Sequence, residues 1–270
     1  MKHLIFFTTI LLTFSTLSVS AKEKQISSHW NGKNVVFIGD SITDKNKVGT
    51  TKNYWEYLQE YMGLNAIVYA TSGDNFINSL KKAEKLSTEK SQDDVDAILI
   101  FVGTNDYMGS TTLGQWYTLS NQPAPVANDK TEIRPRREFS TDSKTFRGRI
   151  NNLMLLLKDK YPQSQIIFLT PLHRGFAKFS KRNVQADETF PNRGGIYVDA
   201  YVEAIKEISN IWAVPVIDLN AISGLFPNMP SHAIYFNKDA NDLLHPNALG
   251  HKRMAKAIAY VLQSYPADFK

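Results

Sequence analysis

Cysteine is absent from this chain of 270 residues. The protein therefore has no disulfide bonds, no thiolate metal sites and no cysteine that could carry a lipid at the mature N-terminus. A chain of this length can bury a core large enough to fold without disulfide bonds, even outside the cytoplasm. After residue 21 no uninterrupted apolar run is long enough to span a bilayer, so we expect no membrane span in the mature chain.

Strong charge is also absent, because 31 basic residues stand against 26 acidic ones and the formal net charge is +5. The one dense basic stretch, Arg134-Pro135-Arg136-Arg137, lacks interleaved aromatic residues and is typical of a solvated loop. We therefore expect no nucleic-acid partner. No cluster has the spacing of metal ligands, so no metal and no cofactor is expected either.

The first residues have the pattern of an export signal. Lys2 supplies positive charge, residues 4–14 form a short apolar run, and Val19-Ser20-Ala21 fits a cleavage site of small residues. The alternative is an N-terminal membrane anchor, but the run is short for a bilayer and polar residues follow it. We expect a signal peptide over 1–21, one domain over 22–270, and a bacterial periplasmic or secreted protein.

Short apolar runs alternate with segments of helical period, which is typical of a parallel sheet flanked by helices. Strands are expected near 34–39, 65–70, 95–102, 165–170 and 213–217, and helices near 51–62, 75–86, 145–160, 196–210 and 247–264. Residues 107–144 and 171–195 are longer than a minimal connection requires. Both leave the carboxyl ends of strands, so we expect both to border the functional site.

A serine, a histidine and an aspartate stand where such a sheet would bring them together. Gly39-Asp40-Ser41 directly follows an apolar run, and Asp242 stands three residues before His245-Pro246 near the end of the chain. Together they supply the groups of a Ser-His-Asp triad. By itself Ser41-Ile42-Thr43-Asp44 also fits a helix capping box, and Asp-x-x-His is common by chance.

Two further loops each follow an apolar run. Gly73 lies in Thr71-Ser72-Gly73-Asp74, and Asn105 lies in Gly103-Thr104-Asn105-Asp106. Both could be ordinary turn residues, since glycine and asparagine are favoured in turns. However, a glycine N–H and an asparagine amide are also suitable donors to the oxyanion that forms when a serine attacks an ester.

In these four blocks, taken in order, the chain resembles the SGNH (GDSL) hydrolases, a family of esterases and lipases. The resemblance spans about residues 34 to 264. It implies an α/β fold, a flavodoxin-like three-layer αβα sandwich with a five-stranded parallel sheet, in a bacterial exported acylhydrolase. In one departure from the family pattern, Val68, Tyr69 and Ala70 stand where members often carry an asparagine before the second-block glycine.

The resemblance assigns roles to these residues. Ser41 is the expected nucleophile, His245 the base and Asp242 the residue that orients it, while the N–H groups of Ser41 and Gly73 and the amide of Asn105 form the oxyanion hole. We expect the two long connections to supply substrate-binding side chains, namely Tyr107, Trp116, His173 and Arg174.

Export and polar long connections favour a carbohydrate O-acetyl esterase, acting on a small-molecule or glycan ester. A lipase, a lysophospholipase or a thioesterase-type acylhydrolase is the alternative within the same class. A non-catalytic glycan-binding module should lack at least one of Ser41, Asp242 and His245, and a phosphate or nucleotide binder should carry a glycine-rich loop with a P-loop lysine. The oligomeric state is left open by the sequence.

Overall fold

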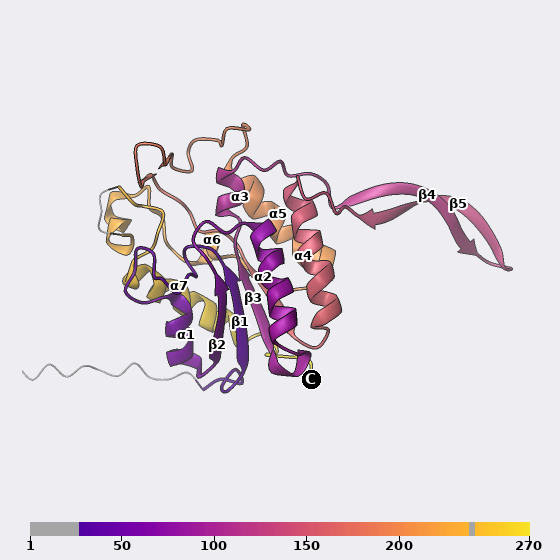
Figure 1. Ribbon diagram of the computed structural model, residues 1–270, viewed down its shortest axis with the longest axis horizontal. Helices are drawn as coiled ribbons and strands as arrows, with labels where there is room; N and C mark the ends of the chain where they lie inside the picture. Colours follow the sequence, from indigo (N-terminus) through magenta and orange to yellow (C-terminus); the bar gives the residue numbers. More distant parts are fainter. Residues whose placement is uncertain (1–26, 238–240) are drawn as a thin grey trace, which may run out of the picture.

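A five-stranded parallel sheet forms the centre of the computed structural model, which describes residues 27–237 and 241–270 (Figure 1). The strands lie in the order β2-β1-β3-β6-β9. They comprise β1 (Asn34–Gly39), β2 (Asn65–Ala70), β3 (Ala97–Phe101), β6 (Gln165–Leu169) and β9 (Val216–Ile217). The predicted α/β fold class is thereby confirmed.

The last strand is shorter than the predicted 213–217. The preceding helix runs on to Trp212 and ends at Ala213, whose φ of 51° places it in the left-handed region. Pro215 then has no N–H to donate to a ladder. Only Val216 and Ile217 remain to pair with β6.

Helices cover both faces of the sheet and give three layers (Figure 1). On one face lie α1 (Tyr54–Met62), α6 (Leu219–Ile222) and α7 (Ala248–Leu262), and on the other lie α2 (Phe76–Glu89), α4 (Phe146–Lys160) and α5 (Val198–Trp212). Alternate residues of β1 supply the two cores: Phe37 packs with the first set and Ile38 with the second.

Side-chain caps fix where the helices begin, which in turn positions the loops at the carboxyl edge of the sheet. Asn75 accepts hydrogen bonds from the N–H groups of Ile77 and Asn78 at the start of α2. Asn247 does the same for Leu249 and Gly250 at the start of α7, immediately after His245-Pro246. A short helix that the sequence did not predict, α3 (Thr104–Met108), begins directly after β3.

The connection over 107–144 differs from its prediction. It contains two ten-residue strands, β4 (Tyr117–Val126) and β5 (Lys130–Phe139), paired antiparallel along their whole length. This hairpin projects from the body beyond α4 and away from the edge where β1 ends (Figure 1), so most of the connection does not border the site. The sequence did not predict these two strands because they contain prolines and charged residues, and both kinds of residue are depleted in ordinary strands.

The connection over 171–195 stays near the sheet edge, as predicted. It includes the two-residue strands β7 (Ala177–Lys178) and β8 (Val184–Gln185), and Ala177 forms a bridge with Asp242. Short 3₁₀ turns occupy Gln92–Asp94 and Pro230–Tyr235.

The expected signal peptide, residues 1–21, lies outside the described residues. Across 27–237 and 241–270, none of the helices combines the length and the apolar character that crossing a bilayer requires.

Candidate active site

The carboxyl ends of three neighbouring strands carry the predicted site residues. Ser41 follows β1, Gly73 follows β2 and Asn105 lies in α3 directly after β3. Because β1 pairs with both β2 and β3 in parallel, these loops emerge side by side at one edge. His245 reaches the same edge from the loop that precedes α7.

Ser41, His245 and Asp242 form a continuous hydrogen-bonded chain. Nε2 of His245 lies 3.0 Å from Oγ of Ser41, although 204 residues separate them in sequence. Nδ1 of the same ring lies 2.9 Å from Oδ2 and 3.1 Å from Oδ1 of Asp242. A carboxylate at Nδ1 favours the tautomer with its proton there, which leaves the Nε2 lone pair directed at the serine hydroxyl.

No helix begins at Ser41, so the capping-box interpretation of Ser41-Ile42-Thr43-Asp44 is wrong. The first helix after β1 starts at Tyr54. The turn is closed instead by Asp40, whose carboxylate accepts the N–H of Ile42 and whose carbonyl accepts the N–H groups of Thr43 and Asp44. The hydroxyl of Ser41 is thereby free to pair with His245.

Asp242 is held by more groups than the sequence indicated. Its Oδ1 accepts the backbone N–H groups of Leu244 and His245, and its Oδ2 accepts Nδ2 of Asn237 at 3.1 Å. Burial acts to raise the pKa of Asp242, but the hydrogen bonds and charge of His245 outweigh it and the pKa lies below its ordinary value. The carboxylate is therefore ionised at neutral pH. No sequence motif marks Asn237.

The N–H groups of Ser41 and Gly73 and the amide of Asn105 lie in neighbouring loops at this edge of the sheet. Gly73 has φ +88°, a left-handed conformation that favours glycine. Among the described residues, no protein acceptor takes the N–H of Ser41 or of Gly73. Asn105 uses Nδ2 to hold the carbonyl of Asp74 at 2.9 Å, which ties its loop to that of Gly73.

Asp44 supports the loop that carries Gly73. Its Oδ2 accepts the N–H of Ser72 at 2.7 Å, and Asp44 itself is buried. The loop that carries Gly73 is therefore held from the β1 side by Asp44 and from the β3 side by Asn105. The sequence pattern alone did not single out Asp44 for this role.

Asp106, the residue directly after Asn105, fixes α3 to two other helices beneath the site. It is fully buried, its Oδ1 pairs with Nη1 of Arg149 at 2.8 Å, and its Oδ2 accepts the N–H of Phe76. Burial raises the pKa of Asp106, against the opposing effect of Arg149. These bonds join α3, α2 and α4.

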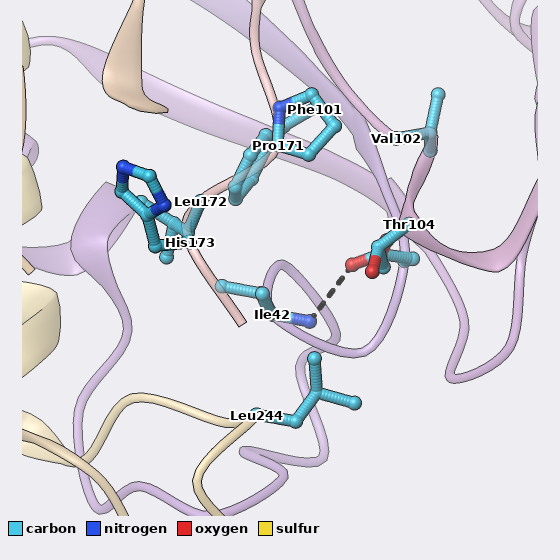
Figure 2. A pocket seen from close by; sticks show the side chains of 9 residues that line it. Ile42, Phe101, Val102, Thr104, Pro171, Leu172, His173 and Leu244 are labelled. Carbon is cyan, nitrogen blue, oxygen red and sulfur yellow. Dashed lines mark hydrogen bonds between the residues drawn. The ribbon is translucent and has the colours of Figure 1, made fainter. Parts of the chain in front are cut away.

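A small crevice lies between the neighbours of Ser41, Asn105 and His245 (Figure 2). Its free volume is about 10 Å³, room for about one water molecule. Figure 2 shows Ile42 and His173 among the side chains of its lining. The backbone N–H of Ile42 donates to the carboxylate of Asp40. The lining residues are Asp40, Ile42, Phe101, Val102, Thr104, Pro171, Leu172, His173 and Leu244.

The carboxyl of Asp40 has an altered acidity. Burial raises the pKa of Asp40 to about 7, although the N–H of Ile42 and the positive charge of His245 oppose the rise. A group this close to Ser41 therefore changes charge near neutral pH.

Of the four predicted substrate-binding residues, His173 alone lines this crevice. Its Nδ1 lies 2.8 Å from Oε1 of Glu188, and that hydrogen bond raises the pKa of His173 above its ordinary value. Its ring also stacks edge-on against Phe226, 4.9 Å away.

The predictions for Tyr107, Trp116 and Arg174 are corrected by the structure, because all three are buried. The hydroxyl of Tyr107 donates to the carbonyl of Phe190. The indole of Trp116 belongs to the core that α4 and α5 cover, and its Nε1 donates to Glu207 on α5. Aromatic residues in a long connection can pack into the core as readily as onto a ligand.

Arg174 lies behind the crevice. Its side chain is 1% exposed, Nη1 donates to Oγ1 of Thr104 at 3.0 Å, and Nη2 donates to Oε1 of Gln185 at 2.7 Å. The guanidinium also lies 5.0 Å from the ring centre of Tyr107. Burial lowers the pKa of Arg174 to about 10, so it remains charged at neutral pH. Arg174 therefore contacts the loop that leads to Asn105.

A larger groove lies on another side of His245. Its volume is about 710 Å³, and it is bordered by the 47–51 loop, Asn237 and the start of α7. Gly49 packs against His245 without room for a side chain, since a Cβ there would lie 2.8 Å from Cβ of His245. Most of its lining is polar or small, and Ile234 and Leu249 add exposed apolar surface.

Comparison with solved structures finds the same fold in bacterial proteins. A Lactobacillus plantarum protein is 24% identical with a TM-score of 0.66, covering 88% of this chain and 100% of that one. A possible lipase from Chitinophaga pinensis is 17% identical with a TM-score of 0.63, covering 85% and 97%. A lipolytic protein of the G-D-S-L family from Veillonella parvula is 16% identical with a TM-score of 0.58, covering 87% and 100%.

Among curated protein sequences, none matches this chain. The sequence model of the GDSL-like Lipase/Acylhydrolase family matches residues 37–253, a span that runs from β1 into α7 and includes Ser41, Gly73, Asn105, Asp242 and His245. The chain therefore belongs to the GDSL-like lipase and acylhydrolase family, whose chemistry is the hydrolysis of esters.

Proposed function

We propose that this protein is a serine esterase in which Ser41 is the nucleophile, His245 the general base and Asp242 the residue that orients the imidazole. The observation that carries the proposal is the pair of distances on either side of the His245 ring, 3.0 Å to Ser41 and 2.9 Å to Asp242. A nucleophile within hydrogen-bond reach of a base, itself held by a third group, is the arrangement that acyl transfer requires.

The reaction proceeds in two halves. Oγ of Ser41 forms a bond to the ester carbonyl carbon while its proton passes to Nε2 of His245, and the oxyanion accepts hydrogen bonds from the N–H groups of Ser41 and Gly73 and from Asn105. Collapse breaks the bond to the alcohol, which takes the proton from His245. Water then attacks the acyl-enzyme by the same route, which releases the acid and restores Ser41.

For the acyl group we propose acetyl. The crevice beside Ser41 has a free volume of about 10 Å³, which is enough to hold about one water molecule or a group of similar size such as a methyl. Phe101, Pro171 and Leu244 wall it with apolar surface. A longer acyl chain would require these buried walls to separate, so its additional methylenes would stay in water.

For the alcohol we propose a carbohydrate. The groove beside His245 is far larger, about 710 Å³, and its lining includes the hydroxyl of Thr51 and the amide of Asn237. Such groups suit the hydroxyls of a sugar, and the exposed Leu249 offers apolar surface to a ring face. An exported enzyme that removes acetyl groups from glycans agrees with the signal peptide expected over residues 1–21.

Activity on esters of graded acyl length tests the proposal. We expect kcat/KM for p-nitrophenyl esters to fall from acetyl to octanoyl, and acetate to be released from an acetylated oligosaccharide. Each buried methylene would contribute about 0.8 kcal/mol if an acyl groove existed, so a lipase should show a steady rise. A rise through octanoate, with no acetate released from acetylated glycans, would assign the protein to the lipases.

A non-catalytic glycan-binding module on the same fold is the rival from another class. Its distinguishing mark would be a missing or separated triad group, whereas Ser41, His245 and Asp242 are hydrogen-bonded here. Purified protein that bound acetylated glycans without releasing acetate, and that hydrolysed no p-nitrophenyl ester, would favour this rival.

A further inference from the structure

An exposed phenylalanine lies against the ring of the triad histidine. The ring centres of Phe179 and His245 are 5.4 Å apart, and the two planes are inclined at 59°. His245 is 5% exposed, whereas Phe179 is 43% exposed. Phe179 therefore contacts the imidazole and still presents a large part of its own ring to solvent. That part of the ring is open to a group that binds beside His245.

The segment that carries Phe179 is tied to the loop that carries Asp242. Ala177, in β7, forms a bridge with Asp242 itself, and the N–H of Lys178 donates to the carbonyl of Asn241 at 2.6 Å. Backbone hydrogen bonds to the triad loop thus continue up to the residue before Phe179. The position of the aromatic ring and the position of the orienting carboxylate are fixed by the same contacts.

The register of the β7–β8 hairpin directs Phe179 toward the body of the protein. Ala177 and Phe179 are two residues apart, so their side chains point to the same side, and Ala177 is fully buried. Lys178 and its cross-strand partner Val184 point to the other side, and both are exposed. The N–H of Phe179 donates to the carbonyl of Asn183 at 2.9 Å, which holds Phe179 in line with the strand.

Gly175 allows the connection to pack closely on the triad loop. A Cβ at Gly175 would lie 2.6 Å from Cβ of Leu243 and 3.0 Å from Cβ of Pro227, and the N–H of Gly175 donates to the carbonyl of Leu243. Any larger residue would push the two segments apart. Phe179 is therefore held in place before a ligand arrives, which reduces the entropy that binding must cost.

The alcohol half of the substrate must come close to this ring. In the proposed reaction the leaving oxygen takes its proton from Nε2 of His245, so it lies within about 3 Å of that atom. A six-membered ring attached to this oxygen spans a distance comparable to the 5.4 Å between the Phe179 and His245 rings. Phe179 lines neither the crevice nor the 710 Å³ groove, so it offers a further surface.

We propose that Phe179 is a specificity-determining residue that packs against the ring of the alcohol when the ester binds. The inference rests on the proposed function and narrows its substrate to acetyl esters of ring-bearing alcohols such as pyranoses, in preference to open-chain alcohols. A pyranose has flat, largely apolar faces and hydroxyls at its rim. An aromatic side chain suits such a face, and polar lining nearby suits the rim.

Contact with the alcohol ring is made in the ground state and in the transition state alike, so it should act on KM and not on kcat. A tenfold change in KM corresponds to about 1.4 kcal/mol. At about 25 cal/mol per Å², this requires about 55 Å² of apolar surface to leave water. One aromatic side chain can bury about 150 to 250 Å², so the exposed part of Phe179 is large enough.

Cyclohexyl acetate and isopropyl acetate test the inference, because both carry an acetyl group on a secondary alcohol and they differ in the ring. For Phe179→Ala we expect KM for cyclohexyl acetate to rise about tenfold with little change in kcat, and both parameters for isopropyl acetate to match wild type. An O-acetylated methyl pyranoside should respond as cyclohexyl acetate does. Phe179→Trp, which keeps an aromatic ring, should keep the wild-type KM.

Val184→Ala is the matched control, because it removes an exposed apolar side chain from the opposite side of the same hairpin. It should leave the kinetics of both esters unchanged. If Phe179→Ala does not fold, Phe179→Leu provides the same test: it keeps apolar volume beside His245 without a flat ring, and KM for cyclohexyl acetate alone should rise.

A fall in kcat of equal size for both esters would overturn the inference, since it would mean that Phe179 only holds the triad loop in place. Wild-type KM for cyclohexyl acetate in folded Phe179→Ala would overturn it as well. Both of these outcomes leave the esterase function intact. Wild type that hydrolyses none of the acetate esters would instead contradict the proposed function, and this inference with it.

Discussion

Nη1 of Arg174 lies 3.0 Å from Oγ1 of Thr104, the residue directly before Asn105. The guanidinium is buried and also holds Gln185, so one side chain connects the 171–195 connection to the loop that presents the amide of Asn105. Arg174 is therefore a positioning residue: it is placed to set the geometry of the oxyanion donors without contact with substrate.

Replacement of Arg174 by Met should lower kcat for p-nitrophenyl acetate by about tenfold to a hundredfold, the cost of a displacement of about 1 Å in a reacting group. KM should change less. Arg174→Lys keeps the charge but loses the forked contact with both Thr104 and Gln185, so it should restore only part of kcat. If both variants melt earlier but keep wild-type kcat when folded, Arg174 has a structural role alone.

Replacement of Asn105 by Ala should lower kcat by about 10² to 10³, which is typical of one lost oxyanion donor, with a smaller change in KM. Asn152→Ala on α4 serves as the control, because its amide bonds to the carbonyl of Thr141 away from the site. A change confined to KM would mean that Asn105 binds substrate in the ground state and does not stabilise the oxyanion.

Replacement of Asp242 by Asn should lower kcat by about 10² to 10⁴, because the amide no longer fixes the proton on Nδ1 of His245. The pKa of Asp242 lies below its ordinary value, so the native carboxylate stays ionised well below neutral pH and should not itself limit activity there. Stopped assays of both proteins across pH 5 to 9 check this. Equal kcat in the variant and wild type would refute the orienting role.

His251 should make the protein less stable in acid. It is fully buried, its Nδ1 accepts the N–H of Tyr54 at 3.1 Å, and burial lowers its pKa to about 3. Below pH about 6.5 this histidine is protonated in the unfolded chain but stays neutral in the folded chain. The free energy of unfolding therefore falls by about 1.4 kcal/mol per pH unit as the pH drops toward 3.

Asp40 has the opposite effect on how stability depends on pH. Because its folded pKa is raised to about 7, the stability that it contributes is present below its unfolded pKa and is lost as pH rises toward 7. The two groups therefore oppose each other between pH about 4 and 6.5. Relative to wild type, His251→Asn should gain about 2 kcal/mol in unfolding free energy between pH 7.5 and pH 5, measured by urea denaturation. If the difference in unfolding free energy between the variant and wild type is the same at pH 7.5 and pH 5, His251 does not titrate as proposed.

Residues 34–39 and 65–70 were predictable as strands because they are short, mostly apolar runs bounded by polar loops. Such runs are typical of strands in a sheet that helices cover on both faces. The convergence of Ser41, Gly73 and Asn105 followed from parallel topology alone. The β4–β5 hairpin was not predictable, because its strands contain proline and charge and face solvent on both sides. Arg174 and Trp116 were placed at the substrate because their sequence neighbours are loop residues, whereas packing buries both. Asn237 and Asp44 were missed because each acts through a contact that no local spacing marks.

The account depends most directly on Ser41 as the nucleophile, because the base, the orienting carboxylate and the oxyanion donors are all arranged around its hydroxyl. The test is covalent labelling with a fluorophosphonate, followed by mass spectrometry of the peptides and by turnover of p-nitrophenyl acetate in wild type and Ser41→Ala. The account predicts one label, on Ser41, and a folded variant with neither label nor significant turnover. Wild-type-like turnover in folded Ser41→Ala, or a label on another residue that abolishes activity, would contradict it.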